Sequence, residues 1–154
     1  MSRRRPSPWG LAFLVVIVSA CSPRLPTGVD TERLQEAISA GIGDPATCVL
    51  IGTRGSAKVA FRYNTRTTCA RELPTCVGAA RGTVGDLLRA VASDGQARAV
   101  SCSASDDGTR GVAWAAGPVS GRDLVYAAVM EGERTLPGHV MADRLAGAFK
   151  DAGL

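Results

Sequence analysis

The chain has 154 residues, with 18 Lys and Arg against 14 Asp and Glu, and a formal net charge of +4. Three of the positive charges are Arg3, Arg4 and Arg5; the rest of the chain is nearly neutral and has no basic stripe that would suit a nucleic-acid surface. The length fits one domain. The apolar fraction of 45% excludes wholesale disorder.

The first 20 residues have the three parts of an export signal. Residues 1–5 are positively charged, residues 9–20 form an apolar run without charges, and small residues precede Cys21. A membrane-spanning helix needs roughly 20 apolar residues, and this run is shorter. The pattern therefore predicts a signal peptide over 1–20 rather than a permanent membrane span.

Residues 18–21, Val-Ser-Ala-Cys, resemble the lipobox of exported bacterial lipoproteins. The resemblance implies that the signal peptide is removed, that Cys21 is lipidated and that residues 21–29 form a tether. It also implies a membrane address. Because Ser22 follows the cysteine, the expected location in a two-membrane cell is the outer membrane, facing the periplasm. In other cells it is the outer face of the plasma membrane. The alternative is an ordinary signal peptide followed by an accidental cysteine.

The next part of the chain predicts a helix and then two strands. Asp30 or Thr31 can cap a helix whose apolar residues follow a helical period up to the glycines at 41 and 43. Residues 47–52 form a short apolar run, and residues 57–63 alternate between apolar and polar side chains. The glycine-containing segment between these two runs has the composition of a hairpin turn.

The second half predicts two more helices with three strands between them. Thr83 and Asp86 fit a capping box for a helix over 83–92, and Pro137 opens the last helix. The three strand patterns lie between these helices, at 96–105, 110–117 and 123–130. The segment 64–82 has no regular pattern.

This order predicts one α+β domain over residues 30–154. Its expected architecture is a five-stranded antiparallel sheet with the N- and C-terminal helices packed on it, plus one inserted helix. Residues 123–130 are apolar on both faces of the strand, so we expect this strand in the middle of the sheet.

Four cysteines remain after Cys21, an even number in an exported chain, and this predicts two disulfides. The residues are Cys48, Cys69, Cys76 and Cys102. Three pairings are possible. The short loop from Cys69 to Cys76 favours a local bridge, which leaves Cys48 to pair with Cys102. Metal binding is the rival interpretation, but no Cys-x-x-Cys is present and His139 is far away in the sequence, so we predict no metal site.

The element order and several residues resemble the α/β half of the penicillin-recognising serine enzymes, above all the class D β-lactamases. Cys-Val-Leu-Ile at 48–51 and Phe-Arg-Tyr-Asn at 61–64 look like the first hairpin of that family. Residues 69–76 look like the approach to its nucleophile. Residues 111–117 and 122–129 look like its last two strands. The resemblance implies a last strand that lies beside the first strand.

The catalytic motifs of that family are missing. The family uses Ser-x-x-Lys, Ser-x-Asn and Lys-Thr-Gly or Lys-Ser-Gly. The chain has only two lysines, Lys58 and Lys150, and a glycine stands three residues before each. One alignment places Cys76 at the nucleophile position, but Ala79 then stands in place of the basic lysine, so a disulfide is the preferred interpretation of Cys76. We predict no catalytic residue and no cofactor.

Other chemistry-bearing residues favour structural interpretations. Ser56 and Lys58 have the spacing of a Ser-Lys dyad but lie at a hairpin turn. His139 stands near a helix start. Asp106 and Asp107, which precede a glycine, are typical of a turn. Glu131 and Glu133 are expected in a solvated loop. Trp114 and Tyr126 are expected as core or sheet-face residues on neighbouring strands.

The preferred interpretation is a non-catalytic, lipid-anchored protein of the cell envelope with a binding or accessory role. Its expected partners are the membrane, through the lipid, and envelope proteins or cell-wall material, and not nucleic acid. Two alternatives stay open. One is a weak hydrolase that uses Cys76 or Ser56, and the other is an unrelated small α+β envelope lipoprotein.

Overall fold

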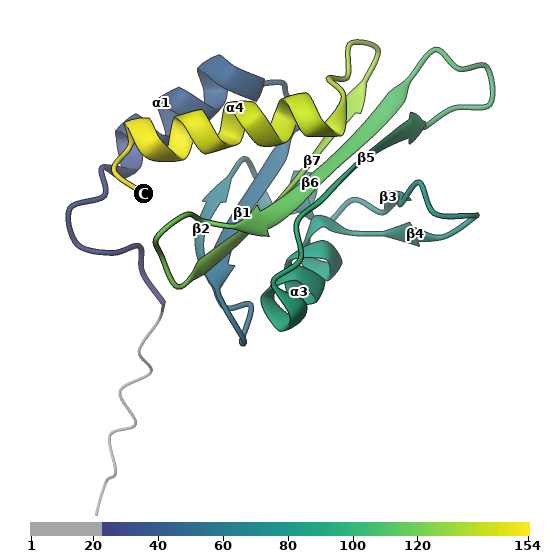
Figure 1. Ribbon diagram of the computed structural model, residues 1–154. Coiled ribbons are helices and arrows are strands. Elements are labelled where there is room, and N and C mark those ends of the chain that lie inside the picture. The colour runs from purple at the N-terminus through teal and green to yellow at the C-terminus, as the bar shows by residue number, and fades with distance from the viewer. Residues whose placement is uncertain (1–22) are drawn as a thin grey trace, which may run out of the picture.

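The computed structural model describes residues 23–154. The expected signal peptide and Cys21 lie outside the described residues. Figure 1 shows three layers, with two helices on one face of a central sheet and a third helix, beside a small hairpin, on the other face. The predicted α+β architecture is confirmed.

The central sheet has five antiparallel strands in the order β2-β1-β7-β6-β5. Their bounds are Cys48–Thr53 for β1, Val59–Tyr63 for β2, Arg98–Ser103 for β5, Gly111–Pro118 for β6 and Leu124–Gly132 for β7. The last strand, β7, pairs with the first, β1, as the family resemblance implies. All residues of β7 except Gly132 are buried, which agrees with the predicted position in the middle of the sheet.

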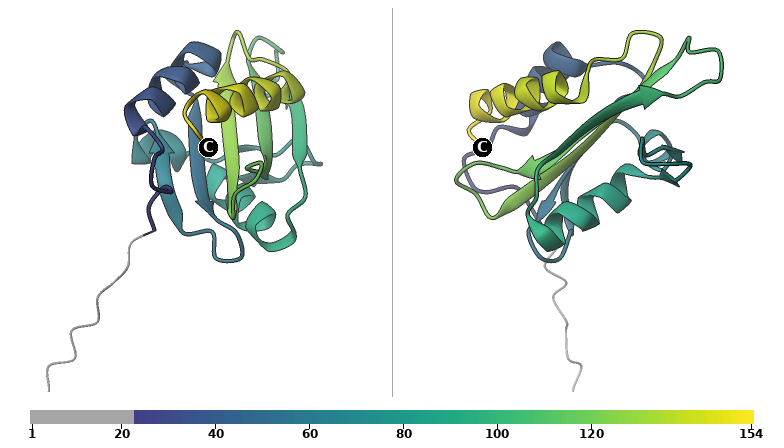
Figure 2. Two further views of the ribbon diagram at one scale, coloured as in Figure 1. Left: turned by 60° about the vertical axis from the view of Figure 1, so that its left-hand side comes forward. Right: turned by 45° about the vertical axis from the view of Figure 1, so that its right-hand side comes forward.

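The N- and C-terminal helices pack side by side on one face of the sheet (Figure 2). They are α1, Thr31–Ile42, and α4, Gly138–Asp151. The carboxylate of Asp30 caps α1 by accepting the N–H of Arg33. The buried side chains of α1 and α4 meet those of the sheet in one apolar cluster, which includes Leu34, Ile38, Met141, Leu145 and Phe149.

The third helix, α3, Val84–Asp94, covers the opposite face. It begins with the predicted capping box, in which Thr83 and Asp86 exchange hydrogen bonds between side chains and backbone. Leu88 and Val91 are fully buried and belong to a second apolar cluster together with Leu50 and other residues of the sheet.

Residues 64–82, which lack a regular pattern, fold on the same side as α3. They contain a short helix, α2, Arg66–Cys69, and a small hairpin of β3, Leu73–Pro74, and β4, Arg81–Gly82. Elements of two to four residues are too short for a helical or alternating period to reveal them.

The predicted disulfide pairing is wrong, although all four cysteines are bonded. The pairs are Cys48–Cys69 and Cys76–Cys102, with Cα atoms 5.3 Å and 5.4 Å apart. Helix α2 brings Cys69 against β1, where Cys48 is buried, and the next residues carry Cys76 away to the edge strand β5. Proximity in sequence suggested a bridge from Cys69 to Cys76, but the chain path between them favours two long-range bridges.

Candidate functional site

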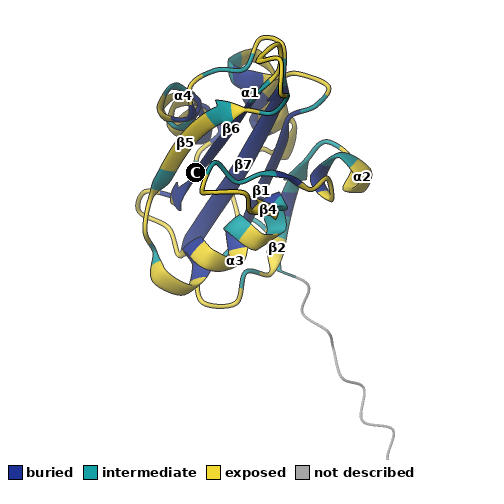
Figure 3. Cartoon of the chain, turned by 90° about the vertical axis from the view of Figure 1, so that its right-hand side faces the viewer, coloured by how far each residue is buried: buried dark blue, intermediate teal, exposed yellow. Residues whose placement is uncertain are grey.

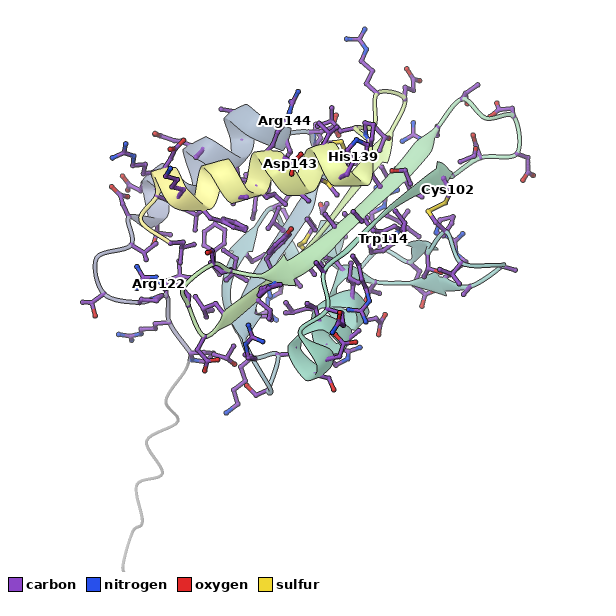
Figure 4. All side chains as sticks on the ribbon, in the orientation of Figure 1. Cys102, Trp114, Arg122, His139, Asp143 and Arg144 are labelled. Atoms are coloured by element: carbon purple, nitrogen blue, oxygen red, sulfur yellow. A yellow bond between two sulfur atoms is a disulfide. The ribbon has the colours of Figure 1, made fainter. Side chains whose placement is uncertain are left out.

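The position that the family resemblance gives to a nucleophile holds no free thiol. The Sγ atom of Cys76 is bonded to that of Cys102, which stands on β5 and is labelled in Figure 4. A thiol must be free and ionised to attack a substrate. The preferred interpretation of Cys76, a disulfide, is therefore confirmed, with Cys102 rather than Cys69 as its partner.

A groove with a volume of 450 Å³ lies next to this disulfide, between α3, β5 and the β3–β4 hairpin. We call it the α3–β5 groove. Its apolar lining residues come from all three walls and from the sheet beneath, and they are Val77, Leu87, Ala90, Val100 and Trp114. Threonines 75 and 83, Gly82, Asp86 and Arg98 complete the lining. No sequence pattern indicates this groove, because its walls come together only in the folded chain.

Trp114, on β6, lies beneath the groove and ties the hairpin to the sheet. Its side chain is almost fully buried, and its Nε1–H donates to the backbone oxygen of Pro74 over 2.7 Å. A buried tryptophan is stable in an apolar core when its ring is packed and its indole N–H has a hydrogen-bond acceptor, and Trp114 has both. The prediction of a core role for Trp114 is confirmed, and its contact with the hairpin is an additional finding (Figure 4).

One wall of the groove is formed by β5, the strand at the edge of the sheet. Within residues 23–154, β5 pairs with β6 alone, so its outer backbone edge has no strand partner. Val100 on this strand is 38% exposed and Val77 on the hairpin is 70% exposed. In Figure 3, β5 is largely yellow, whereas the strands behind it are dark blue. An exposed edge beside exposed valines is a surface on which another chain can pair.

The charged residues around the groove are neutralised in pairs. Arg98 forms an ion pair with Asp94, and this pairing is the first cause that lowers the pKa of Asp94 to about 2. The hydroxyl and backbone of Thr83, followed by Arg89, lower the pKa of Asp86. Both carboxylates are therefore weaker bases than an unpaired aspartate. The groove therefore offers an apolar surface and little chemistry.

The buried carboxylate of Glu131 holds the irregular segment 64–82 against the end of β7. Glu131 is only 4% exposed and accepts hydrogen bonds from Arg110 Nε at 2.6 Å and from Arg71 Nη2 at 2.9 Å. The bond from Arg110 is the main cause of the lowered pKa of Glu131, which burial opposes. The expectation that Glu131 lies in a solvated loop is wrong, because Glu131 is buried near the end of β7, beside two arginines. Glu133 is exposed, as expected.

The remaining candidate residues do not gather at a site, and none of them lines the groove. Ser56 shares a hydrogen bond with Thr53 within the β1–β2 turn. His139 is exposed on the first turn of α4. Asp107 accepts bonds from Ser105 and Thr109, which lower its pKa to about 2 and fit the predicted turn.

Residues 23–154 contain neither a cluster of metal ligands nor a membrane-spanning helix. In that part of the chain, no group of three or more His, Cys, Asp or Glu side chains is arranged to hold a metal ion. None of the helices described there combines the length and apolar character needed to cross a membrane.

No family model matches this chain, and no curated protein matches it significantly.

Proposed function

We propose that this protein is a non-catalytic binding domain of the bacterial cell envelope, held at a membrane by a lipid on Cys21. In this proposal the α3–β5 groove takes up an extended, apolar segment of an envelope protein. The observation that carries it is the apolar groove beside the open edge of β5, with Val77 and Val100 exposed at its mouth.

An extended segment fits this surface for two reasons. The outer backbone groups of β5 can pair with a further strand, which gives affinity without a defined sequence. Alternate side chains of that strand would then point toward the groove, where Leu87, Ala90 and Val100 offer apolar contacts. Because Arg98 and Asp86 are already paired, apolar rather than charged side chains are favoured.

Binding is favoured over catalysis by the same residues. Cys76 is closed in a disulfide, and neither lysine lines the groove. The order of the strands, with β7 beside β1 and the terminal helices on one face, supports a likeness to the sheet of the penicillin-recognising enzymes. We propose that the chain has a reduced form of that fold without its chemistry.

The groove can be tested by photo-crosslinking in living bacteria. A photoreactive residue at position 77 should give an adduct with a partner protein, and Val100→Lys should remove the adduct because a charge enters the apolar groove. The matched control is Val59, which is 37% exposed on β2, the other edge strand of the same sheet. A photoreactive residue at position 59 should give no such adduct, and Val59→Lys should leave the adduct at position 77 intact. Equal adducts at 77 and 59, or an adduct that survives Val100→Lys, would refute the proposal.

A fluorescent penicillin tests the rival hydrolase. We expect no covalent labelling of the purified protein. If the unsubstituted protein is labelled and the labelling is lost in Cys76→Ala or Ser56→Ala, the protein is the hydrolase instead.

The anchor is tested separately. The protein should incorporate labelled palmitate and partition into detergent, and Cys21→Ala should abolish both. Labelling that persists in Cys21→Ala would contradict lipidation at this residue, without bearing on the groove.

A further inference from the structure

The two disulfides differ in how well water and other proteins can reach them. Cys48 is fully buried and Cys69 is 8% exposed, and both belong to the apolar cluster beneath α3. Cys76 and Cys102 are both partly exposed, and they lie between the hairpin and the edge of the sheet. Thiol–disulfide exchange requires direct access to a sulfur atom, so the two bonds should react at different rates.

The Cys76–Cys102 disulfide joins a wall of the groove to its edge strand. Residues 75–80, which include the exposed Val77, form the part of the hairpin that extends beyond Pro74. The nearer part is fixed independently, because Leu73 is buried and Trp114 holds the oxygen of Pro74. Cleavage of the disulfide would therefore release the outer hairpin and leave the domain beneath it folded.

The backbone at Cys76 favours this release. Its φ angle is +64°, in the left-handed region that residues other than glycine rarely adopt. Gly78, two residues further along the chain, also has a positive φ, of +57°, which costs glycine little. A cysteine held in this conformation is expected to relax once its bond to β5 is removed.

We propose that the Cys76–Cys102 disulfide is a reversible latch, which a dithiol reductant of the cell envelope opens while the Cys48–Cys69 disulfide stays closed. One thiolate of the reductant attacks a sulfur of the latch and forms a mixed disulfide, and the released cysteine takes up a proton. The second thiol of the reductant then breaks the mixed disulfide. Two electrons and two protons pass to Cys76 and Cys102, and the reductant leaves as a disulfide.

The latch regulates the site described above. With the bond closed, Thr75 and Val77 complete the groove over Trp114. With the bond open, the outer hairpin moves away and the groove loses one wall. The regulatory part of this inference rests on the proposed function, but the opening of the latch does not, and it can be measured without a partner.

The test titrates the purified full-length protein with reduced thioredoxin, a dithiol, and traps free thiols by alkylation. Mass spectrometry should find Cys76 and Cys102 alkylated at least about tenfold faster than Cys48 and Cys69, while the far-ultraviolet circular dichroism stays unchanged. Alkylation of all four cysteines together, or of Cys48 and Cys69 first, would overturn the proposal.

Trp114 reports on the hairpin. The sequence has two tryptophans, and Trp9 lies in the predicted signal peptide, so the measurement is made on the chain that begins at Cys21, whose one tryptophan is Trp114. The double variant Cys76→Ser/Cys102→Ser should stay folded and emit at longer wavelength, because water reaches Trp114. Loss of folding in this variant, or an unchanged emission spectrum, would overturn the latch.

The matched control, Cys48→Ser/Cys69→Ser, should lose stability while the emission of its folded state stays unchanged. A shift of equal size in that folded control would show that Trp114 does not report on the latch and would overturn the inference. A photo-crosslinking failure at position 77 would refute the proposed partner without changing either result.

Discussion

Two glycines of helix α4 should respond to the same substitution with opposite signs. Gly138 is buried at the first turn of α4, and its N–H donates to Ser101 Oγ over 2.7 Å. Gly147 is exposed in the middle of the same helix. We predict that Gly138→Ala destabilises the fold and that Gly147→Ala stabilises it slightly.

The magnitude follows from the space at each position. A Cβ atom at Gly138 would lie 2.7 Å from the backbone oxygens of Val100 and Trp114, and ordinary contact begins at 3.4 Å. Both atoms belong to paired strands and cannot rotate away, so α4 must lift from the sheet. Overpacking of this kind costs about 1–3 kcal/mol. A Cβ atom at Gly147 meets nothing within 4 Å, and alanine in a helix interior gains about 0.5–1 kcal/mol over glycine.

The assay is urea unfolding at neutral pH with the disulfides intact, followed by far-ultraviolet circular dichroism. Relative to the unsubstituted protein, the midpoint should fall for Gly138→Ala and rise for Gly147→Ala, with unchanged slopes. If Gly138→Ala were as stable as Gly147→Ala, the close approach of α4 to β5 and β6 would be refuted.

Three further predictions concern the face of the sheet that carries α3. In Glu131→Gln, the two arginines lose their carboxylate, and stability at pH 7 should fall by about 1–3 kcal/mol. The pKa of Glu131 is lowered by folding, so its contribution is complete above the ordinary value of 4.5 and is lost as the pH falls through the lowered value. Urea midpoints from pH 7 to pH 3 should therefore converge for the two proteins, and a constant difference would contradict the ion pairs. Thr83→Ala removes the capping box of α3 and should cost about 1 kcal/mol, measured by the same unfolding assay; no loss would mean that the cap contributes nothing. Leu88→Ala leaves a cavity between α3 and the sheet and should cost about 2–5 kcal/mol in calorimetry, whereas a cost below this range would show that the site collapses freely.

The elements that the sequence predicts are those with local signals. Helix α3 has both an amphipathic period and the pairing of Thr83 with Asp86, which lie three residues apart. Strand β7 is apolar on both faces, and this alone indicates a central position. Signals of this kind need no knowledge of the rest of the fold, because they arise within one helix or one strand.

The parts that the sequence does not predict depend on residues that meet only after folding. The two disulfides join positions separated by 21 and 26 residues, and the arginines at Glu131 come from 60 and 21 residues away. No spacing rule links such residues. The α3–β5 groove is of the same kind, because its walls come from α3, β5 and a hairpin of two-residue strands.

The way in which the irregular segment 64–82 is held supports the proposed binding role of this face. A segment with so little regular structure cannot form a stable wall through its own hydrogen bonds, so it is fixed by two disulfides, by Arg71 on Glu131 and by Trp114 on Pro74. Each disulfide closes a loop of a length for which cross-linking contributes about 3–4 kcal/mol. While it is closed, the Cys76–Cys102 bond also holds the sulfur atom that a nucleophile at Cys76 would need. With this disulfide closed, the groove obtains its shape without a free thiol, and the proposed partner would be recognised through shape, apolar contact and the outer edge of β5.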